Sequence, residues 1–244
     1  VKQRQIRARL TVRGFKDVQG QDLSAFAGTA SRAAQRLLTS EAVLQGWEIV
    51  SADVPKAFLQ GISYADLAAQ TGEPLREVCF TVPPATAAEL RKLPGYENFD
   101  EKKEVLTCTK PGTGLRDAPK CFSMKLRRVT VDEVGFVPLA LEGELEMLYE
   151  MRNGARAYSC ILVKHVDDLK IAGEPASVKR LMEALERTFG KLEVERGRFV
   201  HCGIRHIQDP QTKEVSLDQV DFLAAIKEMP YPSVKGTPTE QLLD

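Results

Sequence analysis

The sequence lacks a net charge, a long apolar run, a signal peptide and internal repeats, the features that most directly indicate a class of protein. Its 34 Lys and Arg residues balance its 34 Asp and Glu residues, so the total charge favours no class of partner. The longest uncharged apolar run, residues 157–163, is far too short to span a bilayer. No N-terminal stretch has the apolar core of a signal peptide, and there is no internal repeat or low-complexity tract. We therefore expect a soluble globular protein without a membrane partner.

Cysteines are few and widely separated. The five are Cys79, Cys108, Cys121, Cys160 and Cys202, and no two of them form a CxxC pair. Neither a zinc motif nor a disulfide framework is indicated by this spacing. An odd number of isolated thiols fits a reducing compartment, so we expect an intracellular protein.

Basic residues are nevertheless clustered in two segments. Residues 1–16 contain six Lys and Arg residues and no acid, and residues 110–128 contain six against the single acid Asp117. Clustered bases in a neutral chain are typical of a surface that binds phosphates. Two solvated surfaces without a ligand explain the same pattern, so charge alone does not decide between them.

Hydrophobic periodicity predicts an alternating order of helices and strands. Helices are expected over residues 30–46, 116–129, 176–189 and 219–229, and strands over residues 47–54, 158–164, 169–172, 199–207 and 214–217. Residues 61–107 contain four prolines that break long elements, and we expect them to be irregular. This order favours an α+β fold in which helices cover one face of an antiparallel sheet.

Three aspartates stand where such a fold would bring them to one end of the sheet. Asp167 and Asp168 are expected at the tip of a hairpin, and Asp53 ends the strand over residues 47–54. Adjacent carboxylates repel each other unless a proton or a cation lies between them, and Mg²⁺ prefers oxygen ligands. If Asp53 shares a pocket with the pair, the cluster can hold two metal ions of the kind that act in phosphoryl transfer. The pair alone is also explained by a solvated surface turn.

Seven short segments, in order, are similar to blocks of one known family. The segments are residues 7–16 (RARLTVRGFK), 26–31 (FAGTAS), 53–61 (DVPKAFLQG), 114–120 (GLRDAPK), 165–169 (HVDDL), 202–204 (CGI) and 219–223 (QVDFL). The corresponding blocks are K-A-R-L-V-A-R-G-F, F-A-P-V-A-S, D-V-x-x-A-F-L-x-G, Y-G-L-K-Q-A-P-R, Y-V-D-D-L, L-G-I and Q-x-x-Y-I. Over nearly its whole length the chain therefore resembles the reverse transcriptase domain of copia-type LTR retrotransposons.

The resemblance implies a right-hand polymerase with fingers, a palm of antiparallel sheet backed by helices, and a partial thumb. Residues 1–52 would form the fingers and the start of the palm. Residues 53–190 would form the palm with an insertion near 62–107, and residues 191–244 the end of the palm and a thumb-like connection. The implied partners are RNA and DNA primer–template, dNTPs, and the integrase and RNase H domains of a retrotransposon polyprotein. The implied location is cytoplasmic, in a virus-like particle.

The resemblance also implies RNA-directed DNA synthesis on two Mg²⁺ (or Mn²⁺) ions. By position, Asp53, Asp167 and Asp168 would be the catalytic metal ligands, and the metals would transfer a nucleotide from a dNTP to a primer 3′-hydroxyl. Phe58 would lie under the sugar, where its bulk excludes a ribonucleotide 2′-hydroxyl. A core aromatic is the alternative interpretation of Phe58.

Basic residues in the matching blocks are expected to contact the substrates. Arg9, Arg13 and Arg116 would bind the incoming nucleotide, since a guanidinium matches phosphate oxygens bidentately. Lys120 and His165 would contact the template or primer, and a lysine–phosphate contact contributes affinity rather than sequence choice.

Several positions depart from the family blocks. His165 replaces a Tyr, Asp117 a Gln, Thr113 a Tyr and Phe122 a Trp, and residues 62–76 resemble an insertion. Asp117 would be an acid beside negatively charged substrates. These departures leave open a catalytically decayed, nucleic-acid-binding remnant of the same domain. A different metal-dependent enzyme such as a nucleotide cyclase is the third alternative, and the basic block at 7–16 and the block at 114–120 argue against it.

Overall fold

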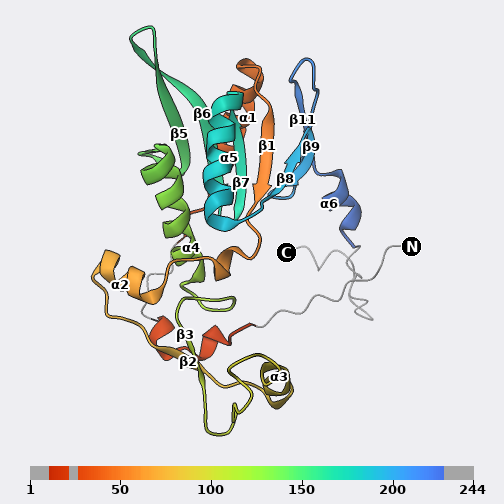
Figure 1. The fold of residues 1–244 in the computed structure, drawn as a ribbon. Helices are drawn as coiled ribbons and strands as arrows, with labels where there is room; N and C mark the ends of the chain where they lie inside the picture. The colour runs from red at the N-terminus through yellow and green to blue at the C-terminus, as the bar shows by residue number, and fades with distance from the viewer. Residues whose placement is uncertain (1–10, 22–26, 228–244) are drawn as a thin grey trace, which may run out of the picture.

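The centre of the fold is a six-stranded antiparallel sheet with the strand order β4-β5-β6-β7-β1-β8 (Figure 1). The structure is a computed structural model that describes residues 11–21 and 27–227. The strands are β4 (Val137–Leu139), β5 (Glu142–Arg152), β6 (Ala155–His165), β7 (Asp168–Gly173), β1 (Ile49–Asp53) and β8 (Glu193–Arg196). Mixed helices and antiparallel strands confirm the expected α+β class.

Helices cover both faces of this sheet rather than the one face that was expected. On one face, α4 (Ala118–Arg127), the π-helix η4 (Arg128–Val134) and α5 (Pro175–Phe189) pack on a core that includes Val50 and Ile171. On the other face, α1 (Arg32–Leu44) packs on Ile49 and Ala172. Figure 1 shows α5 on the near side of the sheet. Consecutive residues of a strand point to opposite faces of the sheet, and in the central strands both are apolar. Each face of the sheet therefore needs an apolar layer to cover it.

The ends of the principal helices follow from local chemistry, and the helices expected over 30–46, 116–129 and 176–189 are confirmed. The Ser31 hydroxyl accepts a hydrogen bond from Ala34 N at 3.1 Å and so caps α1. Gly46 follows that helix at φ 68°, and Gly190 follows α5 at φ 81°. Glycine adopts this backbone region without the steric cost that a Cβ imposes.

The segment over residues 61–107 is more regular than expected. It contains α2 (Tyr64–Thr71) and α3 (Pro84–Leu90), and β2 (Val78–Phe80) pairs with β3 (Leu106–Cys108) in a second sheet. Helix α2 has a capping box between Ser63 and Asp66, and α3 begins with proline, which the first turn of a helix tolerates. Pro84 therefore marks the start of a helix rather than breaking one. In Figure 1 this part lies below the six-stranded sheet.

The strand expected over residues 199–207 is in fact a hairpin. Strands β9 (Arg198–His201) and β10 (Ile204–Gln208) are joined by Cys202 and Gly203, at φ 49° and φ 75°. Two positive φ values in a two-residue turn match the right-handed twist of the flanking strands. Strand β11 (Val215–Asp218) completes a three-stranded sheet with them.

The last described helix, α6 (Val220–Ala225), is shorter than the helix expected over 219–229. Its N-cap is Gln219, and an Asp218 carboxylate oxygen accepts a hydrogen bond from Val220 N at 3.2 Å. Residues 228–229 lie outside the described residues. Within residues 11–21 and 27–227, no helix has both the length and the apolar character needed to cross a bilayer.

Candidate functional site

The register of the sheet brings the predicted aspartates together. Asp53, the last residue of β1, pairs with Asp168, the first residue of β7. The backbone N–H of Val54 donates to the carbonyl of Asp167 at 3.4 Å, so Asp167 lies in the turn beside the end of β1. Because alternate residues of a strand share a face, Asp53 and Asp168 both lie on the face of the sheet that α1 covers.

Asp53 and Asp168 both have raised pKa values, so their surroundings favour the protonated carboxyl over the charged carboxylate. Burial, reinforced by Asp167, Asp168 and Glu193, raises the pKa of Asp53 from 3.8 to about 6. Burial and the Asp167 carboxylate also raise the pKa of Asp168. Glu193 of β8 is paired with Asp53 across the sheet and adds a fourth acid that the sequence motifs did not indicate. A divalent cation bound among these oxygens would relieve the repulsion.

The turn that carries Asp167 and Asp168 has a strained backbone. His165 and Asp168 form its closing pair, and Val166 has φ 60°. A β-branched residue in the left-handed region is a steric outlier, and such conformations persist where surrounding structure enforces them, often at functional sites. In this chain the strained residue directly precedes the paired acids.

A second group of potential ligands overlaps the aspartates. One ligand atom each of His165, Asp168 and Cys202 lies within 4.8 Å of the other two. Among the described His, Cys, Asp and Glu residues, no other trio is this close, so the carboxylates of Asp53, Asp167 and Asp168 converge less tightly. Cys202 reaches the group from the β9–β10 turn. Sequence reasoning missed this group because its members are distant along the chain.

Phe58 lies just beyond β1, in the 3-10 helix η3 (Ala57–Leu59). Its ring is partly exposed and packs against the core on the α4 and α5 side of the sheet. The Gln60 amide holds the loop in place, because it donates to the carbonyls of Pro55 at 2.8 Å and Phe189 at 3.0 Å. Phe58 is therefore fixed near the end of β1 that carries Asp53, with one side open to solvent.

Two of the family blocks that are far apart in sequence meet in the structure. Val12 N donates to the carbonyl of Thr113 at 3.0 Å. A Cβ on Gly14 would lie 2.0 Å from the carbonyl oxygen of Gly114, so only glycine allows this approach. Exposed Arg13 and Lys16 lie beside this contact and line a cavity of 750 Å³ together with β2. Arg9 lies outside the described residues.

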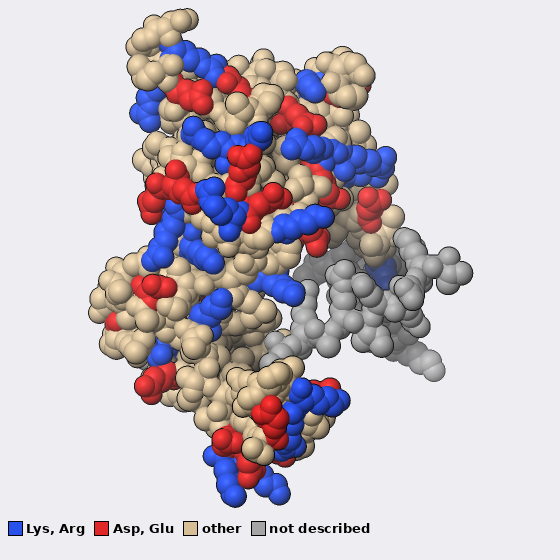
Figure 2. All heavy atoms as spheres, viewed as in Figure 1, with Lys and Arg blue, Asp and Glu red and all other residues tan. Residues whose placement is uncertain are grey.

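Three of the six basic residues in the second cluster contact protein groups. Arg116 donates to the carbonyl of Gly20 at 3.0 Å, and Lys120 lies 3.4 Å from a carboxylate oxygen of Glu73. Lys125 stacks on the ring of Phe189. Figure 2 shows basic and acidic side chains interspersed over the visible face rather than gathered by sign.

Asp117 is buried, so it is not the exposed acid that the resemblance implied beside negatively charged substrates. Its carboxylate accepts a hydrogen bond from Arg76, which also contacts Asp17. The Arg76 guanidinium also lies over the Tyr64 ring, 5.3 Å from its centroid. Arg76 is supplied by the segment that resembles an insertion, and it neutralises the acid that departs from the family pattern.

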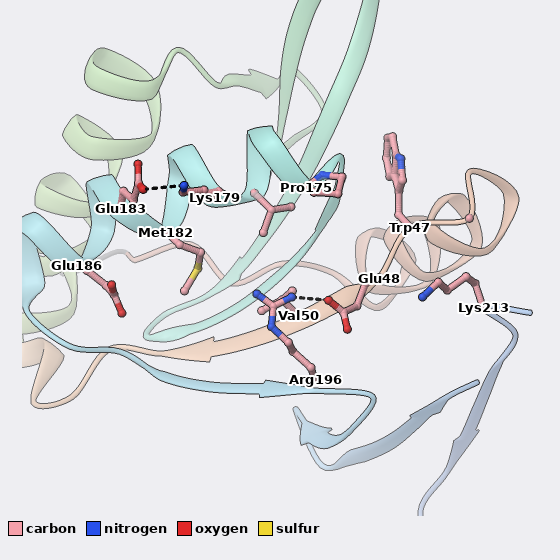
Figure 3. A pocket seen from close by; sticks show the side chains of 13 residues that line it. Trp47, Glu48, Val50, Pro175, Lys179, Met182, Glu183, Glu186, Arg196 and Lys213 are labelled. Atoms are coloured by element: carbon pink, nitrogen blue, oxygen red, sulfur yellow. Dashed lines mark hydrogen bonds and ion pairs between the residues drawn. The ribbon is translucent and has the colours of Figure 1, made fainter. Parts of the chain in front are cut away.

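The cavity in Figure 3 is separate from the aspartates. It has a volume of 590 Å³ and lies between α5, β1 and β8, with Val50, Met182 and Arg196 among its lining residues. The Arg196 guanidinium pairs with Glu48 across it. None of the three aspartates lines this cavity, so it is not the predicted catalytic pocket.

Comparisons with known proteins agree with the motifs. Over 191 residues the chain is 27% identical to the retrovirus-related Pol polyprotein from transposon RE2 of Arabidopsis thaliana. The match covers 78% of this chain and 11% of that polyprotein. A solved structure of apo telomerase from Candida tropicalis, truncated from its C-terminal domain, aligns with a TM-score of 0.42 and 10% identity, covering 83% of this chain and 42% of that one. A likeness of that size carries no conclusion about function.

The family model described as reverse transcriptase (RNA-dependent DNA polymerase) matches residues 1–231, which is nearly the whole chain. This match and the transposon relative confirm the resemblance to copia-type domains that the motifs indicated. The chain belongs to the reverse transcriptase family.

Proposed function

We propose that the chain is an RNA-directed DNA polymerase that adds dNTPs to a primer 3′-hydroxyl, with two Mg²⁺ (or Mn²⁺) ions held by Asp53, Asp167 and Asp168. The observation that supports this most is the pairing of Asp53 with Asp168 beside Asp167. The donor set fits the metal, because Mg²⁺ prefers carboxylate oxygens and would offset the burial and the repulsion between acids that together raise the pKa of Asp53. When bound, such ions activate the attacking hydroxyl and neutralise charge on the triphosphate.

The other predicted residues take roles around that centre in this proposal. Phe58, fixed at the end of β1, selects against the ribonucleotide 2′-hydroxyl by steric clash. Arg9, Arg13 and Arg116 bind the triphosphate, and Lys120 and His165 contact the template or primer. Exposed Arg13 beside the 750 Å³ cavity supports the role of the opening basic block.

The domain organisation is part of the same proposal. We assign residues 1–52 to fingers and the start of the palm, 53–190 to the palm with an insertion near 62–107, and 191–244 to the end of the palm and a thumb-like connection. The chain spans only 11% of the transposon polyprotein that it matches. We therefore also propose that integrase and RNase H domains lie elsewhere in a parent polyprotein, which acts in a cytoplasmic virus-like particle.

Primer extension by the purified chain tests the proposal. With Mg²⁺ or Mn²⁺ and dNTPs, extension is expected on RNA and DNA templates, and Asp53→Asn should abolish it. Asp132→Asn is the matched control, because Asp132 is an exposed acid of η4 outside the cluster, and it should leave extension unchanged. Extension that survives in a folded Asp53→Asn protein rejects the assignment. Salt-sensitive primer–template binding without any incorporation by the unmodified chain would instead identify a decayed remnant.

A further inference from the structure

The trio His165, Asp168 and Cys202 combines three different donor atoms at one point of the surface. His165 ends β6, Asp168 begins β7, and Cys202 lies in the turn between β9 and β10. Their ligand atoms lie within 4.8 Å of one another, and Cys202 is exposed, so a solvated cation can reach them. An imidazole nitrogen, a carboxylate oxygen and a thiol sulfur form a donor set suited to zinc rather than to magnesium.

The spacing is close to that of a zinc centre. Zinc bonds of about 2.0 Å to nitrogen or oxygen and about 2.3 Å to sulfur put the ligands of a tetrahedral site roughly 3.5 Å apart. Side-chain rotations that move the donors by about 1 Å would therefore close the trio around an ion. Three protein ligands leave the fourth position to water or substrate.

Two of the three ligands stand where this chain departs from the family blocks. His165 occupies the position of the Tyr in Y-V-D-D-L, and Cys202 occupies the position of the Leu in L-G-I. These positions are 37 residues apart in the printed numbering, yet the fold brings both departures to the same aspartate. A Tyr and a Leu would provide no comparable nitrogen and sulfur donors.

A buried network joins the hairpin that carries Cys202 to the six-stranded sheet. The ammonium group of Lys170 donates to His206 Nε2 at 2.8 Å, Thr39 Oγ1 at 2.6 Å and the Gln35 carbonyl at 3.2 Å. These three bonds join β7 to β10 and to α1. Lys170 lies two residues after Asp168 on the same face of β7, so the network joins β10, the strand that follows the Cys202 turn, to the strand that Asp168 begins.

We propose that His165, Asp168 and Cys202 form a binding site for a thiophilic divalent cation, Zn²⁺ in the first instance, which withdraws Asp168 from the Mg²⁺ centre and thereby inhibits nucleotide addition. Binding joins the metal to the Cys202 sulfur and releases the thiol proton to solvent. Occupation of the site stands on the geometry alone, whereas the inhibition rests on the proposed polymerase function.

Cobalt titration tests occupation without any need for activity. Co²⁺ replaces Zn²⁺ and gives a thiolate-to-metal charge-transfer absorption when sulfur is a ligand. Added to the reduced, metal-free chain, one equivalent of Co²⁺ should saturate this absorption, and Zn²⁺ should abolish it by displacement. Cys202→Ser should remove the absorption, whereas Cys79→Ser, a matched change of another exposed cysteine, should preserve it. An absorption that persists in Cys202→Ser, or that Cys79→Ser removes, overturns the site.

A second variant tests the nitrogen ligand separately from the sulfur ligand, with folding checked for each protein. His165→Tyr installs the family residue and keeps the Cys202 thiol, so the absorption should require much more Co²⁺ to saturate. The melting temperature of each variant without metal establishes that it is folded. An unchanged Co²⁺ affinity in folded His165→Tyr contradicts the proposed nitrogen ligand.

Zinc inhibition of primer extension tests the consequence. In constant Mg²⁺, rising Zn²⁺ should inhibit the unmodified chain and Cys79→Ser at the same concentration, and Cys202→Ser only at a concentration at least tenfold higher. Equal inhibition of Cys202→Ser overturns the inhibitory role. If the unmodified chain extends no primer in Mg²⁺ alone, the polymerase proposal fails by itself, and the cobalt titration still decides whether the site exists.

Discussion

At the scale of single residues, Asp53 combines burial with three neighbouring acids, and this has a measurable effect on stability. Its pKa is 3.8 when unperturbed and about 6 in the folded chain, so the folded state binds the proton more tightly. The stability that this preference contributes is fully present below pH 3.8 and is lost as the pH rises through about 6. Above that range the charged carboxylate destabilises the metal-free fold.

We therefore expect Asp53→Asn to raise the stability of the metal-free chain at neutral pH by about 1 kcal/mol, a modest gain because solvent screens this partly exposed group. The gain should vanish in acid, where Asp53 is already protonated. Mg²⁺ should raise the melting temperature of the unmodified chain more than that of the variant. Thermal unfolding across this pH range, with and without Mg²⁺, provides the measurement. A variant less stable than the unmodified chain at neutral pH would contradict the repulsion described above.

Phe58 provides a second prediction for a single residue. Replacement by Val removes the ring proposed to lie under the sugar, and incorporation of ribonucleotides relative to deoxyribonucleotides should rise by about 10- to 100-fold. The ratio of kcat/KM for the two substrates measures this effect. Leu59→Val is the matched control, since Leu59 is an exposed neighbour in η3. An unchanged ratio in Phe58→Val would favour the alternative of a core aromatic, which the packing of Phe58 against the core also accommodates.

At the scale of elements, hydrophobic periodicity predicted the long helices α1, α4 and α5 and missed the short helix α2, although that helix has its own capping box. Strand β5 contains four glutamates and was not expected. Glu146 is buried within it because Lys164 of β6 donates to its carboxylate at 2.6 Å, and Glu144 lies 3.3 Å from the same ammonium group. A pattern of alternating acids indicates a strand only when the neutralising lysine of the next strand is known.

The contact between α2, β2 and the start of α4 gives the prediction that belongs to this scale. Arg76 lies between the carboxylates of Asp17 and Asp117, and all three side chains are largely buried. Arg76→Met should destabilise the chain by about 3–5 kcal/mol, because it leaves two buried acids without a counter-charge. Asp117→Asn should cost less, since Arg76 retains Asp17. Urea unfolding gives both values, and equal or smaller loss in Arg76→Met would show that the triad is not the main support of this contact.

At the scale of the whole molecule, the sequence predicted which acids converge but not what surrounds them. Asp53, Asp167 and Asp168 belong to recognisable motifs, and the antiparallel register brings them to one end of the sheet. Glu193 and Cys202 stand in segments without a motif for metal binding, and only tertiary pairing reveals that they belong to the same region. In the second basic cluster the sequence predicted phosphate contacts, whereas Arg116, Lys120 and Lys125 already contact protein groups.

A chain with no net charge must bind a polyanion through local contacts, and this sets the last prediction. Each phosphate contact contributes about 0.9 to the slope of log affinity against log salt, so Lys120→Ala should lower that slope by about one. Binding should weaken equally for different primer–template sequences, because a phosphate contact does not read bases. Fluorescence anisotropy with the non-extending Asp53→Asn protein measures this without turnover. Lys179→Ala changes an exposed lysine of α5 that pairs with Glu183 beside the cavity in Figure 3, and it should leave the slope unchanged. If both variants keep the original slope, Lys120 remains paired with Glu73 in the complex and does not contact the primer–template backbone.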